Sequence, residues 1–139
     1  MIEFSSDLKT IPHSDRDIFR VLSDLRNLDL IKSMIPEDKV KDFVFDKDSV
    51  SFRVDNIGKV SFIVIERSPD NYVRFKSEKL PFEVFLEIQL QMKSEMETEL
   101  IMHATSDLNP FMKSVVEKPM REAVDSIAEA ITYLPYDQI

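Results

Sequence analysis

Residues 80–92 read LPFEVFLEIQLQM, and apolar and polar side chains alternate along them. One side of this stretch carries Val84, Leu86, Ile88, Leu90 and Met92. The other side carries mostly carboxylates and amides, from Glu83, Glu87, Gln89 and Gln91. Successive side chains of a β-strand point to opposite faces, so the pattern predicts a strand with one face against a core and one toward solvent.

The period of two continues on both sides of this strand, from residue 41 to residue 106, without a helical interruption. The region therefore predicts six consecutive strands joined by hairpins. A turn through Lys47 and Asp48 would pair the first two of these strands. Their shared inner face then holds Phe43, Phe45, Val50 and Phe52. The single glycine, Gly58, falls in a later loop where a left-handed backbone conformation is expected.

The segment before these strands predicts one strand and two short helices. Residues 2–11 alternate, with Ile2, Phe4 and Leu8 on the inner side. Ser14 has the side chain of an N-cap and precedes apolar residues at helical spacing. A second short helical piece, in NLDLIKSMIP, ends before Pro36.

Asn109 and Pro110 mark the start of a long last helix, because asparagine caps helices and proline suits the first helical position. This helix is predicted to run to about Leu134 and to lie on the sheet. Its apolar stripe and the flanking residues are Met112, Val116, Pro119, Met120, Ala123, Val124, Ile127, Ala130, Ile131 and Leu134. Pro119 removes a backbone hydrogen bond in mid-helix, so we expect a kink near it. The kink either forms a hinge or pocket mouth or follows the curve of the sheet.

The composition narrows the possible functions. The 139 residues suffice for one domain, 1–139, with its own core. The absence of cysteine excludes disulfides and thiolate chemistry, and a single glycine excludes glycine-rich phosphate loops. A net charge of −8 argues against nucleic acid as a partner. With neither a signal peptide nor a long apolar run in the sequence, we expect a cytoplasmic protein without a membrane span.

The order of elements resembles the helix-grip fold of the START-like superfamily, also called SRPBCC or polyketide cyclase-like. The resemblance covers the whole chain and is carried by FSSDLKTIPHSDRDIFRVLSDLRNL, IPEDKVKDFVFDKDSVSF and LNPFMKSVVEKPM…IAEAI. These segments are similar to a small subgroup without settled activity. The resemblance implies an α+β fold, in which a curved seven-stranded antiparallel sheet (β-α-α-β6-α) packs on the long C-terminal helix. It also implies an apolar cavity between sheet and helix, which in many relatives holds a lipid, hormone or polyketide.

We therefore expect a non-enzymatic protein that binds a small apolar or amphipathic molecule without a cofactor. The predicted ligand-binding side chains are Phe52, Phe62, Phe75, Leu86, Ile88, Leu100, Met102, Met112, Val116 and Met120. The alternative for the same residues is a filled core, since ten phenylalanines could completely fill the space between the sheet and the last helix.

A cyclase or dehydratase-type enzyme using the same pocket is a further alternative. The resemblance implies that catalytic relatives place arginine, tyrosine, histidine or acidic groups inside the cavity. Strand alternation instead puts four such residues on the outer face, namely Arg53, Arg74, Glu87 and His103. No catalytic residue is therefore assigned. No metal site is predicted either, because His13 and His103, the only histidines, have no carboxylate at a ligand spacing.

The outer face of the middle strands suggests another kind of function. Four apolar residues are predicted there, which are Ile63, Ile65, Phe85 and Ile101. An apolar patch on the outside of a sheet is typical of a surface that contacts another protein. A homodimer or a protein partner bound through this face is therefore the third hypothesis.

Overall fold

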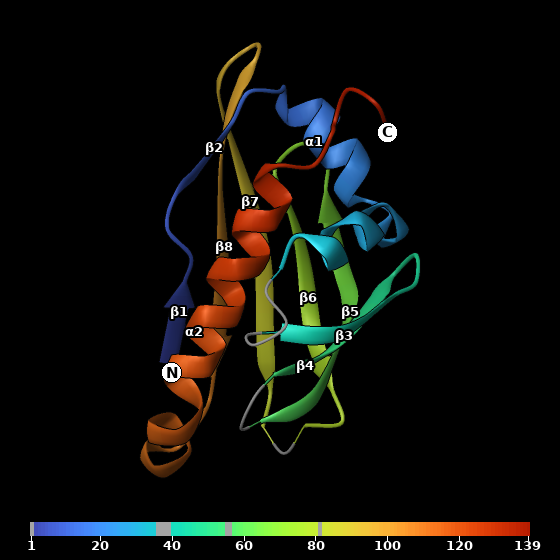
Figure 1. Cartoon of the computed structure of the whole chain (residues 1–139). Helices are drawn as coiled ribbons and strands as arrows, with labels where there is room; N and C mark the ends of the chain where they lie inside the picture. Colours follow the sequence, from blue (N-terminus) through green and yellow to red (C-terminus); the bar gives the residue numbers. More distant parts are fainter. Residues whose placement is uncertain (1, 36–39, 55–56, 81) are drawn as a thin grey trace.

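The structure, a computed structural model, describes residues 2–35, 40–54, 57–80 and 82–139. Strand, short helices, consecutive strands and a long helix follow one another in the predicted order (Figure 1). The elements are β1 (Ile2–Ser5), β2 (Lys9–Ile11), α1 (Asp15–Leu22), the 3-10 helix η1 (Leu25–Ser33), β3 (Val40–Phe45), β4 (Ser49–Val54), β5 (Gly58–Ser68), β6 (Tyr72–Glu78), β7 (Val84–Ser94), β8 (Glu97–Ser106) and α2 (Pro110–Thr132).

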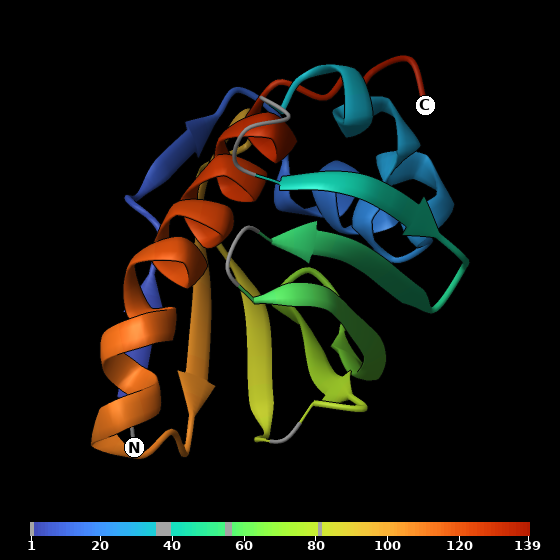
Figure 2. The ribbon, with the colours of Figure 1, turned by 60° about the horizontal axis from the view of Figure 1, so that its bottom comes forward.

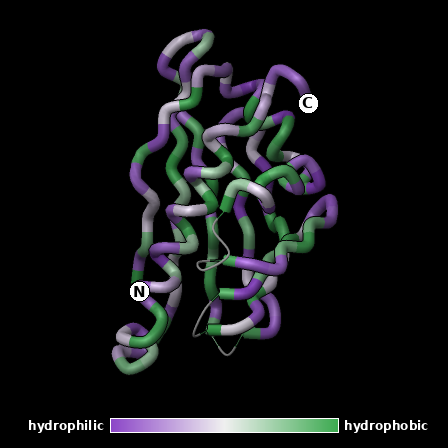
Figure 3. The backbone as a smooth tube through the Cα atoms, viewed as in Figure 1, coloured by the Kyte–Doolittle hydropathy of each residue, from purple (hydrophilic) through white to green (hydrophobic). Residues whose placement is uncertain are grey.

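One antiparallel sheet contains all the strands of the described residues, in the order β1-β8-β7-β6-β5-β4-β3, with β2 also paired to β8. Figure 2 shows the sheet curling so that its β3–β4 end turns toward α2. Helix α2 contacts β1 and β8 at one end of the sheet and β4 and η1 at the other. Alternating hydrophilic and hydrophobic residues follow the strands in Figure 3, and the hydrophobic ones supply the surface on which α2 lies.

The sheet has eight strands instead of seven, because the predicted first strand is divided at Ser6. The Ser6 amide donates to the Met102 carbonyl at 2.8 Å, and the Ser6 hydroxyl accepts from the Met102 amide at 3.0 Å. A side chain thus takes the place of a backbone acceptor, and the ladder with β8 resumes only at Lys9. The interruption reverses the alternation, so Ile11 is buried, whereas Leu8, predicted to face inward, is 57% exposed.

Strand β3 contains a bulge that the alternation pattern did not predict. Its register against β4 shifts between Lys41 and Val44, and Asp42 has a φ of 58°. The bulge places Phe43 on the inner face, where it and Phe52 are buried, as predicted. Phe45 pairs with Val50 in the register expected for the hairpin.

Met92 corrects the prediction for the strand at residues 80–92. It was expected to face inward with Val84, Leu86, Ile88 and Leu90, which are buried, yet Met92 is 56% exposed. The β7–β8 hairpin extends past the C-terminal end of α2 (Figure 1), so its tip lies away from the core.

Helix α2 begins as predicted, with the Asn109 side chain accepting a hydrogen bond from the Met112 amide at 2.8 Å and Pro110 in the first turn. It continues through Pro119 as one element, and the kink expected there stays a prediction. The buried face of the helix consists of Val116, Met120, Ala123, Val124, Ile127, Ala128, Ala130 and Ile131. None of the helices in the described parts of the chain is both long and apolar enough to span a membrane.

Candidate functional site: an apolar cavity beneath η1

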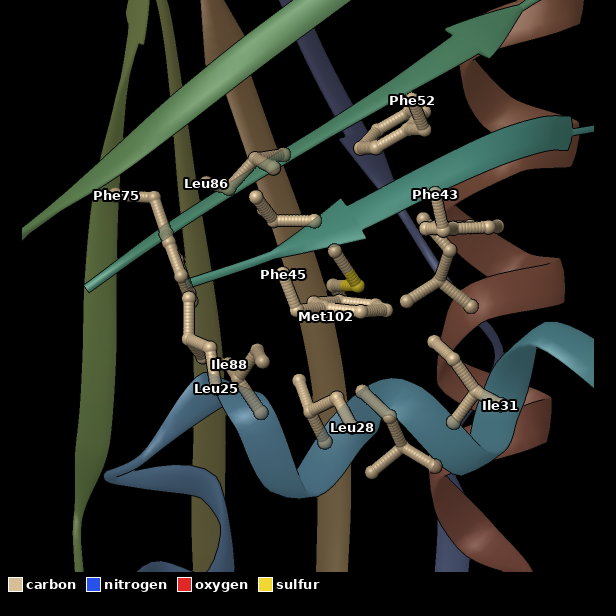
Figure 4. A pocket seen from close by; sticks show the side chains of 13 residues that line it. Leu25, Leu28, Ile31, Phe43, Phe45, Phe52, Phe75, Leu86, Ile88 and Met102 are labelled. Atoms are coloured by element: carbon tan, nitrogen blue, oxygen red, sulfur yellow. The ribbon is translucent and has the colours of Figure 1, made fainter. Parts of the chain in front are cut away.

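A small cavity of about 30 Å³ lies between η1, the inner face of the sheet and the C-terminal half of α2 (Figure 4). Side chains from all three layers converge on it. They are Leu25, Leu28, Ile31, Phe43, Phe45, Val50, Phe52, Phe75, Leu86, Ile88, Met102, Ile127 and Ile131. Every one of these side chains is apolar.

The three η1 residues follow from a spacing of three in the sequence. Leu25, Leu28 and Ile31 lie on one side of η1 because a 3-10 helix has three residues per turn. All three are buried, and Figure 4 shows them pointing from η1 toward the phenylalanine rings of β3. The 3-10 geometry aligns the wall that η1 forms, since an α-helix would spread these three residues over an arc of about 120°.

The N-terminal end of η1 is held by polar contacts. Asp24 caps it by accepting from the Arg26 amide at 3.1 Å and pairs with the Arg26 guanidinium at 2.6 Å. Hydrogen bonding to Arg26 lowers the pKa of the Asp24 carboxyl from 3.8 to about 2. The Arg67 guanidinium donates to the Ser23 carbonyl at 3.0 Å, and the side-chain amide of Asn27 donates to the Val21 carbonyl at 3.0 Å.

Phenylalanine rings form the side of the cavity next to β3 and β4. Phe43 and Phe45 are stacked, with centroids 5.5 Å apart and planes 8° apart. Phe43 also lies 5.2 Å from Phe52, which in turn lies 6.0 Å from Phe62. Aromatic pairs at such distances contribute dispersion and quadrupole attraction in addition to burial.

Five of the ten predicted ligand-binding residues line this cavity: Phe52, Phe75, Leu86, Ile88 and Met102. The others lie elsewhere: Phe62, Leu100, Val116 and Met120 are buried outside its lining, and Met112 is half-buried. The three predicted residues of α2 lie outside the lining because the cavity contacts this helix at Ile127 and Ile131. Ile127 lies about 12 Å along the helix from Pro119 at 1.5 Å per residue, whereas Met112, Val116 and Met120 lie near or before the proline.

Eight lining residues were not among the predicted ligand contacts, namely Leu25, Leu28, Ile31, Phe43, Phe45, Val50, Ile127 and Ile131. The sequence assigns the last five to inward faces of the hairpin and the helix. The first three belong to η1, and the apolar spacing of three in LRNLDLI is the signal from which they could have been predicted.

None of the lining residues carries a titratable group. A tyrosine, Tyr136, is buried nearby, and its hydroxyl donates to the carbonyl of Ile131 at 2.6 Å. Burial raises the pKa of Tyr136 far above its usual value. The cavity is thus suited to hold an apolar group and lacks a side chain that could transfer a proton.

Polar residues predicted for the outer face lie there in ion pairs and hydrogen bonds. Arg74 pairs with Glu87 at 2.7 Å and Glu66 at 2.8 Å, and Ser5 Oγ lies 2.6 Å from His103 Nδ1. Arg53 pairs with the exposed Asp42 at 3.4 Å. Within the parts of the chain that the structure describes, no three side chains are arranged to hold a metal ion.

The predicted apolar residues of the outer face are divided by this polar row. Ile65 and Phe85 line a depression of about 370 Å³ together with Arg74, Leu86, Glu87, His103 and Thr105. In the register of the sheet, the row Arg74, Glu87 and His103 lies between Phe85 and Ile101. Ile63 lies opposite Lys76, which is opposite Phe85.

Comparison with known proteins shows the fold. No protein-family model and no curated protein matches the sequence. A START superfamily protein from Mycobacterium smegmatis has a similar structure, with a TM-score of 0.61 and 12% identity over 94% of each chain. Norcoclaurine synthase from Thalictrum flavum, in complex with dopamine and hydroxybenzaldehyde, has a TM-score of 0.73 and 12% identity over 99% of this chain and 89% of its own. A protein from Thermus thermophilus has a TM-score of 0.67 and 20% identity over 94% of both chains.

The antiparallel sheet and its C-terminal helix therefore form the helix-grip fold of START-like proteins. This fold is compatible with the binding of a ligand. At these identities the likeness shows the fold alone.

Proposed function

We propose that the protein binds a small apolar molecule in the cavity beneath η1. The observation that supports this function is the lining, in which 13 side chains from η1, the sheet and α2 are all apolar. Such a lining favours an apolar ligand, because removing apolar surface from water contributes about 25 cal/mol per Å². Water would gain no hydrogen-bond partner from these side chains.

The ligand must displace part of the wall. Pockets for small molecules usually measure about 300–1,000 Å³, whereas this cavity measures about 30 Å³. Helix η1 is the part of the wall best suited to move, since it has nine residues and 3-10 helices of more than about four residues are uncommon. Its start is held by Arg67 and Asn27, so we expect the end near Ile31 to move outward.

Binding fits the lining better than catalysis does. A cyclase or dehydratase needs a group that can give or take a proton, and no lining residue supplies one. The structural likeness to norcoclaurine synthase, whose structure holds two small aromatic compounds, supports an aromatic or similarly compact ligand. The rings of Phe43, Phe45 and Phe52 offer aromatic contacts for such a molecule.

A neutral fluorescent probe, N-phenyl-naphthylamine, tests the proposal. Its emission should rise on binding to the full chain, and it should raise the melting temperature of the protein. Leu28→Ala should strengthen probe binding by enlarging the cavity, although it should lower the free energy of unfolding by about 2–5 kcal/mol. Leu28→Phe should weaken binding by filling the cavity.

Leu30→Ala is the matched control, because Leu30 lies on the exposed side of the same helix and is 51% exposed. It should leave probe binding unchanged. The proposal is wrong if neither the natural chain nor Leu28→Ala binds the probe, and if native mass spectrometry of protein purified from its own host shows only the free chain.

A further inference from the structure

A surface groove lies behind one wall of the cavity. It measures about 270 Å³ and is lined by Lys32, Val40, Lys41, Asp42 and Phe43. Phe43 also lines the apolar cavity, and its side chain is only 7% exposed. The Phe43 ring thus separates the cavity from a groove that opens to solvent.

The backbone around Phe43 suits a side chain that changes position. Phe43 follows Asp42 in the β3 bulge, and β3 is the last strand in the order of the sheet. Bulges redirect side chains and are common at sheet edges. The ring packs on Phe45 and Phe52, and a phenylalanine ring makes no strong hydrogen bond that would have to break when it rotates.

The groove also carries positive charge, although the chain as a whole has a net charge of −8. Its one carboxylate, Asp42, pairs with Arg53 at 3.4 Å, and Lys32 pairs with Asp29 at 2.7 Å. Lys41 makes no ion pair with any residue that the structure describes, and in the sheet register it lies opposite Arg53. An anion in the groove would therefore meet a lysine that is not already paired.

We propose that the ligand is an apolar molecule with one anionic group, such as a carboxylate or sulfonate. Its apolar part enters the cavity past Phe43, and its anionic group stays in the groove beside Lys41. This inference rests on the proposed function and adds the charge of the ligand and its route of entry. The cavity alone would select for apolar character, while the groove would select for the acid.

Two probes that differ by one group test the charge. Anilinonaphthalene sulfonate carries the aromatic rings of N-phenyl-naphthylamine and an added sulfonate. We expect the natural chain to bind the sulfonate probe more tightly, and added salt to weaken only that probe. Lys41→Met should reduce affinity for the sulfonate probe about two- to fivefold, as expected for an exposed ion pair, and leave the neutral probe unaffected. Lys113→Met, which removes the same charge on α2, should change neither affinity.

The route of entry is tested by the rate of association, measured by stopped-flow fluorescence. Phe43→Leu keeps most of the buried volume while removing the ring, so it should accelerate entry of both probes. Phe4→Leu is the control, because Phe4 is buried in β1 and lines neither the cavity nor the groove. It should leave the association rate unchanged.

The outcomes separate the two proposals. If neither probe binds, the proposed function fails and this inference fails with it. If both probes bind with equal affinity and Lys41→Met changes neither, the ligand needs no acid, and only the present inference is overturned. Equal association rates for Phe43→Leu and Phe4→Leu would overturn entry past Phe43.

Discussion

Among single residues, Ser6 has a large effect on the fold because its side chain replaces a backbone partner. Its hydroxyl accepts from the buried Met102 amide at 3.0 Å, and this bond divides β1 from β2. Ser5, the preceding residue, is exposed and contacts the ring of His103 at 2.6 Å. Removing the Ser6 hydroxyl would leave the buried Met102 amide without an acceptor, whereas removing the Ser5 hydroxyl would affect only an exposed contact.

Ser6→Ala should lower the free energy of unfolding by about 1–3 kcal/mol, the cost of a buried donor left without a partner. Ser5→Ala should change it by no more than about 0.5 kcal/mol, as is usual for surface positions. Chemical denaturation of the two variants measures both values. Equal effects would show that the Ser6 hydroxyl does not hold the strand break.

Asp24 gives η1 a dependence on pH. Its pKa in the folded chain is lowered from 3.8 to about 2, so the ionised form stabilises the folded state above about pH 4. This stabilisation should be lost as the pH falls from about 4 to 2. Asp24→Asn keeps a capping side chain without the charge, so the difference in melting temperature from the natural chain should shrink over that range. A difference that stays constant down to pH 2 would contradict the assignment.

Among the elements, α2 contacts the cavity through its C-terminal half alone, at Ile127 and Ile131. Pro119 lies outside this contact and is half-buried. Its effect should therefore be on the shape and stability of the helix, since a proline in mid-helix costs about 3 kcal/mol.

Pro119→Ala should raise the free energy of unfolding by up to about 3 kcal/mol and leave the affinity for N-phenyl-naphthylamine unchanged. Denaturation and fluorescence titration of the same preparation measure both quantities. A change in probe affinity at improved stability would instead identify Pro119 as a hinge for the pocket.

At the scale of the whole molecule, the outer face is the surface through which we propose that copies of the chain or another protein associate. Its depression of about 370 Å³ contains Ile65 and Phe85 beside the Arg74–Glu87 ion pair. Aromatic residues and arginine are both enriched at protein interfaces.

Changing Ile63 and Phe85 together to serine should weaken self-association at least about tenfold, the scale expected for truncation of a central aromatic residue. Sedimentation velocity over a range of protein concentrations measures the effect. Val44→Ser is the control, because Val44 is an exposed apolar residue of β3. If the natural chain already sediments as a monomer, or the double variant sediments as the natural chain does, self-association through this face is wrong.

The sequence predicted the inward faces of the strands where pairing is regular and the strand lies over the core, as at Leu86, Ile88, Leu100 and Met102, but not at Met92 in the projecting β7–β8 hairpin. It also predicted a positive φ at Gly58, where φ is 97°. It failed where a single residue interrupts the ladder. Ser6 exposes Leu8, and the bulge at Asp42 shifts the β3 register, because period-two alternation holds only while both strands advance together.

By itself, the sequence determined the order of elements and the apolar stripe of α2, since these follow from local periodicity and capping. The helix-grip fold was implied by the resemblance of that order to START-like proteins. Only the tertiary structure decided where a void remains. Phe43, Leu28 and Ile131 are far apart in the chain, and whether they fill a common volume depends on how η1, β3 and α2 pack together. The same packing places Phe43 between cavity and groove, because one side chain can border two spaces only after the elements around it are positioned.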